Sequence, residues 1–462
     1  MTTIPNTPTM RATSLALLLA AGVAACTFDI VNPNAPEQIG TNPSQPRVAA
    51  AVTGLLIAAR ADQTAWILKQ AIMGREGYRF DTAEPRFVSE LISGPLDPGS
   101  GFGGGQWGLE FRAIKSAYNL LNVIGTASAL SATQQDAVRG FAHTMIAYSF
   151  MTVLEAHTED SIPIDVNRTL DQPLAPFVTN AAGYAHVASL LDSAKTELAG
   201  GGSAFPFDLG EGFAGFDQPS TFAAFNRALF ARVQAYRASP QLGCAACWDS
   251  VLTAVTAAQA AFGADTAVSL DRGVYFTYSA TLPGDAANGL FQDPSSAIQV
   301  VHPFVTDSAE KKADSTLDNR YLAKVTPRGS SVSSNNGLAS DKSWIRYPTP
   351  SSPVPIIRNE ELILLRAEAN LGKGNNALAA TDINAIRVKS GGLPEIPTLA
   401  VAGTPAILSQ LFKQRFYSLL YEGHRWVDLR RYGRMNTLQP DRVGDSFFTT
   451  LPIPNNEVLA RK

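Results

Sequence analysis

Acidic and basic side chains recur among apolar ones in the C-terminal part of the chain, between residues 356 and 433. Such groups could exchange protons with a substrate, or they could pair with one another. Helical periodicity is strong here, and an unpaired charge in an apolar helical core costs several kcal/mol. We therefore interpret these residues as structural ion pairs rather than as a catalytic centre. They are Arg358, Glu361, Arg366, Glu368, Arg387, Arg415, Glu422, Arg425, Asp428 and Arg430.

The sequence contains none of the short motifs that mark common active sites. G-x-S-x-G, H-E-x-x-H, G-x-x-x-x-G-K-[ST] and D-F-G are all missing, and the histidines are scattered. No metal site or cofactor is predicted. Two carboxylates far apart in the sequence would suffice for a glycosidase, so a glycan-degrading enzyme stays an alternative. The prediction is that the protein is not an enzyme.

The composition is that of a globular protein. Of 462 residues, 45% are hydrophobic and 17% are charged, and the formal net charge is −3. This hydrophobic content permits a large core and excludes a disordered chain. The nearly balanced charge gives no basic footprint for nucleic acid, so no nucleic-acid partner is predicted.

Residues 1–25 are predicted to be a lipoprotein signal peptide. Arg11 supplies a positive charge, an apolar run follows at 15–21, and small residues stand directly before Cys26. Cys26 would then carry the lipid anchor. Residues 26–47 are rich in Asn and Pro, which predicts an extended tether. An ordinary secretory signal with an incidental cysteine is the alternative.

Two further cysteines, Cys244 and Cys247, are separated by two alanines. An exported chain meets an oxidising compartment, so a local disulfide between them is the favoured interpretation. A thioredoxin-like redox pair would need a βαβ setting, and a zinc site would need two more soft ligands.

Periodicity predicts a single domain over residues 48–462. A helical scaffold would occupy about 48–262 and 356–433, and an irregular region with short strands would occupy about 263–355. One helix is expected over 48–70, and others over 107–124, 131–158, 182–198, 221–238 and 248–262. Long loops are expected over 74–107 and 271–347, and loops of this length are functional or disordered.

The C-terminal quarter resembles the SusD/RagB family of outer-membrane nutrient-binding lipoproteins. The most specific stretch runs from Tyr421 to Gly433 (YEGHRWVDLRRYG). LRAEAN at 365–370, INAIR at 383–387 and LPIP at 451–454 add to it. The resemblance implies a mainly α fold: a SusD-like scaffold of helical hairpins of tetratricopeptide type, with a loop-rich, irregular ligand-binding half beside it.

The resemblance also implies a function. SusD-like proteins are anchored by lipid at the outer membrane, capture a nutrient and deliver it to a TonB-dependent SusC-like transporter. Their ligand is most often an oligosaccharide and sometimes a peptide. No metal or redox cofactor is essential to binding, although some members bind a structural calcium. A helical interaction scaffold without a small-molecule ligand is the alternative.

Sugars present apolar ring faces and hydroxyl edges, which favours aromatic platforms flanked by polar side chains. The family's ligand residues lie in variable loops, so none is transferred by motif. The candidates in the two loops are Tyr78, Arg79, Trp107, Tyr275, Tyr278, Asn288 and Trp344. Trp107 begins an amphipathic helix, which favours a core position over a platform, whereas Trp344 could equally pack the long loop against the helices. If residues 274–278 form a strand, Tyr275 and Tyr278 lie on opposite faces.

The chain departs from the family pattern near Arg415. Gln414 and Ser418 stand where the family has glutamates. Arg415 therefore lacks two carboxylate neighbours that the pattern places beside it.

Overall fold

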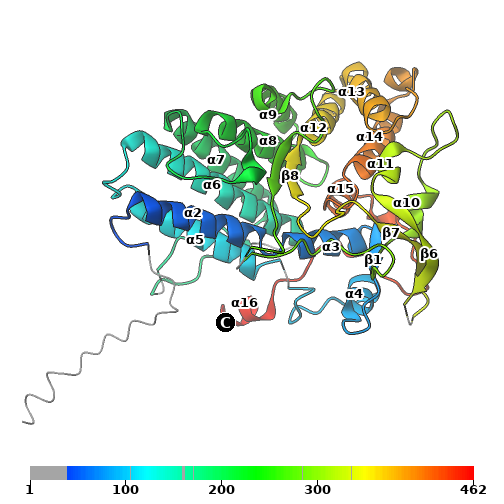
Figure 1. Ribbon diagram of the computed structural model, residues 1–462, viewed down its shortest axis with the longest axis horizontal. Helices are drawn as coiled ribbons and strands as arrows, with labels where there is room; N and C mark the ends of the chain where they lie inside the picture. The colour runs from blue at the N-terminus through cyan, green and yellow to red at the C-terminus, as the bar shows by residue number, and fades with distance from the viewer. Residues whose placement is uncertain (1–38, 105, 159–161, 170, 283–284, 335) are drawn as a thin grey trace, which may run out of the picture. The chain divides into compact units, whose positions relative to one another are not determined.

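The computed structural model describes residues 39–104, 106–158, 162–169, 171–282, 285–334 and 336–462 (Figure 1). The predicted signal peptide, Cys26 and residues 26–38 of the tether lie outside the described residues. Helix α2 (Gln45–Arg60) begins inside the segment predicted as tether, with Pro46 in its first turn. Proline is well suited to this position because its fixed φ matches the helix and its missing N–H has no partner there. Residues 41–462 form one unit.

The helix predicted over 48–70 is two helices. The chain breaks after Arg60 and restarts as α3 (Gln63–Met73). Asp62 stands at the start of α3, and aspartate favours helix ends over helix interiors because its side chain competes with the backbone for hydrogen bonds. The break turns the second half of the segment inward, so that Trp66 is buried.

Five helices form the N-terminal scaffold, and each packs against the next in the chain. Figure 1 shows α6, α7 and α8 lying side by side. The predicted mainly α scaffold of helical hairpins is confirmed. The helices are α5 (Gly108–Ile124), α6 (Ala132–Ala156), α7 (Asn180–Gly200), α8 (Pro219–Ala238) and α9 (Cys247–Phe262). A disulfide joins Cys244 to Cys247 at the start of α9.

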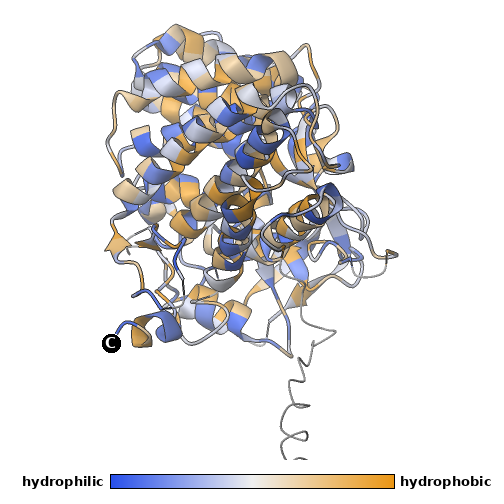
Figure 2. Ribbon diagram, turned by 90° about the vertical axis from the view of Figure 1, so that its left-hand side faces the viewer, coloured by the Kyte–Doolittle hydropathy of each residue, from blue (hydrophilic) through white to orange (hydrophobic). Residues whose placement is uncertain are grey.

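Four helices follow near the C-terminus. They are α12 (Asn359–Gly372), α13 (Asn376–Lys389), α14 (Thr404–Ser418) and α15 (Arg425–Arg431). The first three share an apolar core of fully buried side chains, which include Ile363, Leu364, Ile383, Ile386, Ile407 and Leu411. Figure 2 shows hydrophobic and hydrophilic residues mixed along the same helices, as amphipathic packing requires.

A small antiparallel sheet joins the two regions predicted as long loops. Its strand order is β1 (Gly77–Arg79), β5 (Gln299–Val301), β7 (Ala339–Trp344) and β6 (Val325–Ser333). Tyr78 lies opposite Val300, so the segment after α3 is fixed against residues more than 200 positions later. The irregular regions are therefore held together by backbone pairing.

The remaining elements are short. Two further sheets pair β2 (Ile162–Pro163) with β3 (Phe177–Val178), and β4 (Gly273–Phe276) with β8 (Val354–Arg358). Short helices are α4 (Arg86–Val88), α10 (Pro303–Asp307), α11 (Asn319–Leu322) and α16 (Asn455–Leu459). Single turns of π or 3₁₀ helix lie at Ser89–Ser93, Glu211–Phe213, Leu399–Val401 and Met435–Thr437. In the described part of the chain, no helix has both the length and the apolar character to cross a membrane.

Candidate ligand-binding cleft

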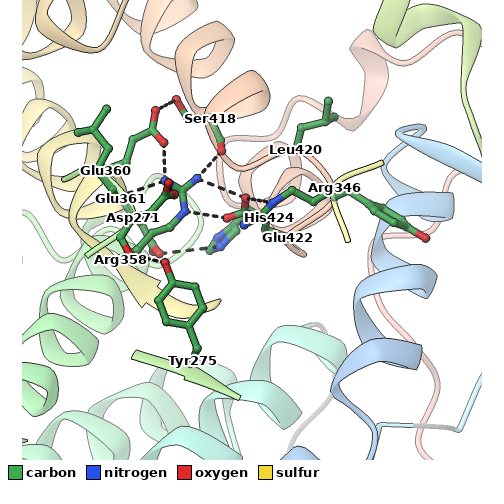
Figure 3. Close-up of polar contacts among 12 residues, drawn as sticks. Asp271, Tyr275, Arg346, Arg358, Glu360, Glu361, Ser418, Leu420, Glu422 and His424 are labelled. Carbon is green, nitrogen blue, oxygen red and sulfur yellow. Dashed lines mark hydrogen bonds and ion pairs between the residues drawn. The ribbon is translucent and has the colours of Figure 1, made fainter. Parts of the chain in front are cut away.

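The charged residues of the C-terminal region form buried ion pairs around Arg358, the last residue of β8 (Figure 3). The Arg358 guanidinium donates to Glu422 Oε2 at 3.1 Å, to the Ser418 carbonyl at 2.5 Å and to Glu360. Burial alone would raise the pKa of Glu422, but the charges of Arg358, Lys324 and Arg346 outweigh it and hold that pKa well below its usual value. Glu422 is therefore a permanent anion within a cationic setting.

Similar pairs join the other helices. Arg232 on α8 holds Glu361 on α12 at 2.6 Å. Further along, Asp428 on α15 accepts from Arg415 at 2.7 Å and from Arg431 at 2.9 Å. These charged side chains pair with one another, which confirms the interpretation of the charged residues as structural ion pairs. Arg425 differs, because no carboxylate among the described residues pairs with it.

The aromatic candidates predicted from the loops are mostly core residues. Tyr78, Trp107, Tyr278 and Trp344 are each less than 8% exposed. Tyr78 donates a hydrogen bond to Asp441 Oδ1 at 2.7 Å, and Trp107 packs edge-on against His157. Their rings are in contact with the protein itself. None of the four offers a free face at the surface.

The polar candidate Asn288 is also buried. Its amide donates to the Ser352 carbonyl at 2.8 Å, and its Oδ1 accepts from the Leu290 N–H at 2.8 Å. Asn288 thus fixes the loop that contains it.

Tyr275 and Tyr278 do not share a strand, because β4 ends at Phe276. Tyr275 is half-buried and lines a cavity of about 310 Å³ beside α2. Arg60 of α2 stacks over the ring of Tyr278 at 5.1 Å. Tyr78 and Arg79 are neighbours on β1, and Tyr275 and Tyr278 lie close together in the chain. Beyond this, the structure does not bring the seven candidates together in one site.

Arg79 is the one candidate that lies in a cleft between the two long loops. One wall comes from β1 and the residues after it, and the other from the end of β6. The cleft has a volume of about 160 Å³ and is lined by Arg79, Phe80, Asp81, Thr82, Pro85, Val88, Ser333, Ser334 and Asn336. Sequence reasoning missed all of these except Arg79. The run of hydroxyl residues from Ser330 to Ser334 was an available signal.

Charged groups and hydroxyl groups both line this cleft. Arg79 Nη2 donates to Asp81 Oδ2 at 2.8 Å, and the guanidinium stacks on the ring of Phe87 at 4.4 Å. The hydrogen bond from Arg79 lowers the pKa of Asp81, so the carboxylate stays ionised. Thr82, Ser333 and Asn336 are exposed. The cleft therefore offers donors and acceptors suited to hydroxyl-bearing ligands.

The structure is thus a helical scaffold with a polar cleft built from loops, and comparison with known proteins shows which family it resembles. The model of the SusD family matches residues 335–457. Together with the fold, this match confirms the resemblance to the SusD/RagB family. The comparison with curated proteins gave no match.

Solved structures of SusD superfamily proteins share the fold. One from Parabacteroides distasonis is 15% identical with a TM-score of 0.67, covering 89% of this chain and 97% of its own. One from Bacteroides vulgatus is 16% identical with a TM-score of 0.66, covering 90% and 97%. Surface glycan-binding protein A from Bacteroides uniformis is 14% identical with a TM-score of 0.66, covering 90% and 98%. At these identities the likeness concerns the fold alone.

Proposed function

We propose that this protein is a lipid-anchored binding protein of the outer-membrane surface. It captures a nutrient and delivers it to a TonB-dependent SusC-like transporter. The preferred ligand class is an oligosaccharide, and a peptide is the second candidate. One observation carries the proposal: on a SusD-type fold, the two long loops meet at a cleft built from a guanidinium–carboxylate pair, hydroxyl groups and an amide. The glycan-binding neighbour from Bacteroides uniformis supports the ligand class.

The cleft would accept one end or one ring of the ligand. Its volume of about 160 Å³ is below the roughly 300–1,000 Å³ of pockets for drug-sized molecules. Arg79 and Asp81 would bind adjacent hydroxyl groups of a sugar, with Asn336 and the two serines on the opposite wall. The rest of a chain-like ligand would extend over the surface.

Calorimetry against a panel of glycans and peptides tests this proposal. The variant Arg79→Ala should weaken binding of the best ligand about tenfold or more, as expected for loss of a hydrogen bond from a charged group. Arg112→Ala removes an exposed arginine from α5 and serves as the matched control. Equal affinity of the Arg79 variant and the wild type would remove this cleft from the ligand site. Hydrolysis of a panel member would support an enzyme instead.

Anchoring and delivery have their own tests. The variant Cys26→Ala should leave the outer-membrane fraction, because lipidation at Cys26 would be its anchor. Delivery requires a barrel partner, so the wild-type protein should co-purify with a TonB-dependent transporter from its own cells. If the protein purifies without such a partner and binds no panel member, the scaffold alternative gains support.

A further inference from the structure

A further cavity lies between α10, α14 and α15, which Figure 1 shows close together. It has a volume of about 290 Å³. Its lining residues differ from those of the cleft at Arg79. Phe412 and Phe416 contribute to it from one face of α14, since residues four apart on a helix lie on the same side. Phe304 of α10 adds a third ring and is 42% exposed. The cavity thus has apolar aromatic walls and an opening to solvent.

Two arginines stack on these rings. The Arg425 guanidinium lies 4.0 Å from the centre of the Phe416 ring and 5.0 Å from that of Phe304. Arg434 lies 4.7 Å from the centre of the Phe412 ring. Throughout the described ranges, neither guanidinium has an ion-pair partner. Stacking uses the faces of these groups and leaves their N–H edges able to bind an anion.

The backbone restrains Arg425 in this arrangement. Its Nε donates to the Gly74 carbonyl at 2.8 Å. In the described part of the chain this is the only hydrogen bond of its guanidinium. The two terminal nitrogens are therefore held at the cavity without an acceptor of their own.

A third arginine reaches the cavity from its buried side. Arg415 is 1% exposed and binds Asp428 through Nε and Nη2. Its Nη1 has no hydrogen-bond partner among the described residues, and Glu368 Oε2 is 4.0 Å away, beyond hydrogen-bond distance. A buried donor without an acceptor is unfavourable, and an oxygen atom of a ligand would satisfy it.

The neighbouring side chains of Gln414 and Ser418 do not satisfy this donor. Gln414 and Ser418, which replace the family's glutamates, both accept hydrogen bonds from Arg320 of α11. They bring no carboxylate to Arg415.

The other charges at the cavity leave it cationic. Asp428 is already bound by Arg415 and Arg431. Glu76 is buried, and its burial raises its pKa to about 7, so it is only partly ionised at neutral pH. Lys413 lies at the rim, 3.7 Å from Glu310.

We propose that this cavity is a binding site for a small carboxylic acid with an aromatic or aliphatic body. The body would lie between Phe304, Phe412 and Phe416, and the carboxylate would face Arg415 Nη1 and the edges of Arg425 and Arg434. This site is separate from the nutrient cleft and does not depend on the function proposed there.

Calorimetry on the purified full-length protein with phenylacetate tests the site, with phenylacetamide as the neutral analogue of the same shape. Phenylacetate should bind at least about tenfold more tightly, because only it pairs with the guanidinium groups. Arg434→Gln should remove most of this preference, and Phe304→Ala should weaken binding of both probes. Arg434 is half-buried and makes no ion pair among the described residues, so Arg434→Gln should fold, which thermal unfolding verifies.

Two controls separate this site from the cleft. Arg112→Gln removes an exposed arginine elsewhere and should bind phenylacetate as the wild type does. Arg79→Ala should also leave phenylacetate binding unchanged, even if it abolishes glycan binding. Equal binding of the acid and the amide, no binding of either at millimolar concentration, or unchanged binding by Arg434→Gln would each overturn the proposal.

Discussion

The indole of Trp344 stacks on the phenol ring of Tyr421, with ring centres 4.2 Å apart and 3° between the planes. Trp344 ends β7, whereas Tyr421 opens the stretch that resembles the family most closely. Tyr421 OH donates to Gln299 Oε1 of β5 at 2.6 Å. The contact therefore attaches the small sheet to the C-terminal helices. The Trp344 ring, which was predicted as a ligand platform, has its face covered by Tyr421.

Trp344→Ala should destabilise the fold. Removal of a buried indole leaves a cavity and costs about 3–5 kcal/mol, which should appear as a lower thermal unfolding midpoint. Trp344→Phe keeps a stacking ring and should lose less. Weakened glycan binding by Trp344→Ala at unchanged stability would instead return this ring to the ligand site.

Glu422→Gln should also lower stability. Arg358, Lys324 and Arg346 all contact Glu422, and removal of its charge leaves buried cations without their counter-ion. Breaking such a network from one side costs about 3–5 kcal/mol, measurable as a shift in the denaturant midpoint. The matched control is Glu395→Gln, since Glu395 is exposed. Equal effects of the two substitutions would contradict a structural role for the network.

The same network sets the response to acid. The pKa of Glu360 is lowered to about 2: burial opposes this shift, and the charge of Arg358 outweighs it. The folded state therefore holds protons on this group less tightly than the unfolded state does. Its contribution to stability is complete above the unfolded pKa of about 4.3 and disappears as the pH falls toward 2. Unfolding followed from pH 6 to pH 2 should show this loss, and Glu360→Gln should reduce it.

Glu110 on α5 should give stability the opposite dependence on pH. Burial raises its pKa to about 8, so the folded state binds the proton more tightly than the unfolded state. Stability from this group is complete below the unfolded pKa of about 4.3. It is lost as the pH rises toward 8, by about 1.4 kcal/mol per pH unit. Glu110→Gln keeps the acceptor for Gln63 and should make stability less dependent on pH in this window. A wild-type slope in the variant would show that Glu110 does not titrate there.

Reduction of the disulfide should have a modest effect. Cys244 and Cys247 close a loop of four residues, and so short a loop restricts the unfolded chain by about 2 kcal/mol. The double variant Cys244→Ser, Cys247→Ser should have the same denaturant midpoint as the reduced wild type. Added reductant should not change the midpoint of the variant. Equal denaturant midpoints of the wild type with and without reductant would show that this disulfide adds no stability.

Local signals in the sequence predicted the helices well. Ser131 accepts a hydrogen bond from the Gln134 N–H at 3.2 Å, as expected of a residue that caps a helix start. The charges of the C-terminal helices could be interpreted because a buried charge requires a partner wherever that partner comes from. The first inference depends on hydrogen bonds between residues close in the sequence. The second depends on the free-energy cost of burying an unpaired charge, which is the same wherever the partner lies in the chain.

The ligand-facing residues could not be predicted in the same way. Tyr78 is buried because β1 pairs with β5, and this pairing joins segments more than 200 residues apart. The neighbouring residue Arg79 faces the cleft because side chains alternate along a strand. Only the register of a long-range contact decides which of the two meets solvent, and the sequence around them carries no mark of it.

The ion pairs and hydrogen bonds of the C-terminal stretch also have a consequence for the order of folding. Arg425 binds the Gly74 carbonyl across 351 positions, and Arg430 binds the Glu155 carbonyl across 275. A ribosome synthesises the early helices first, so α3 and α6 wait for partners that are made last. The nascent chain cannot complete its core before α15 has emerged. Helices α5 to α9 can pack on one another as they are made, whereas the contacts around α3 and the end of α6 are completed only by the last part of the chain.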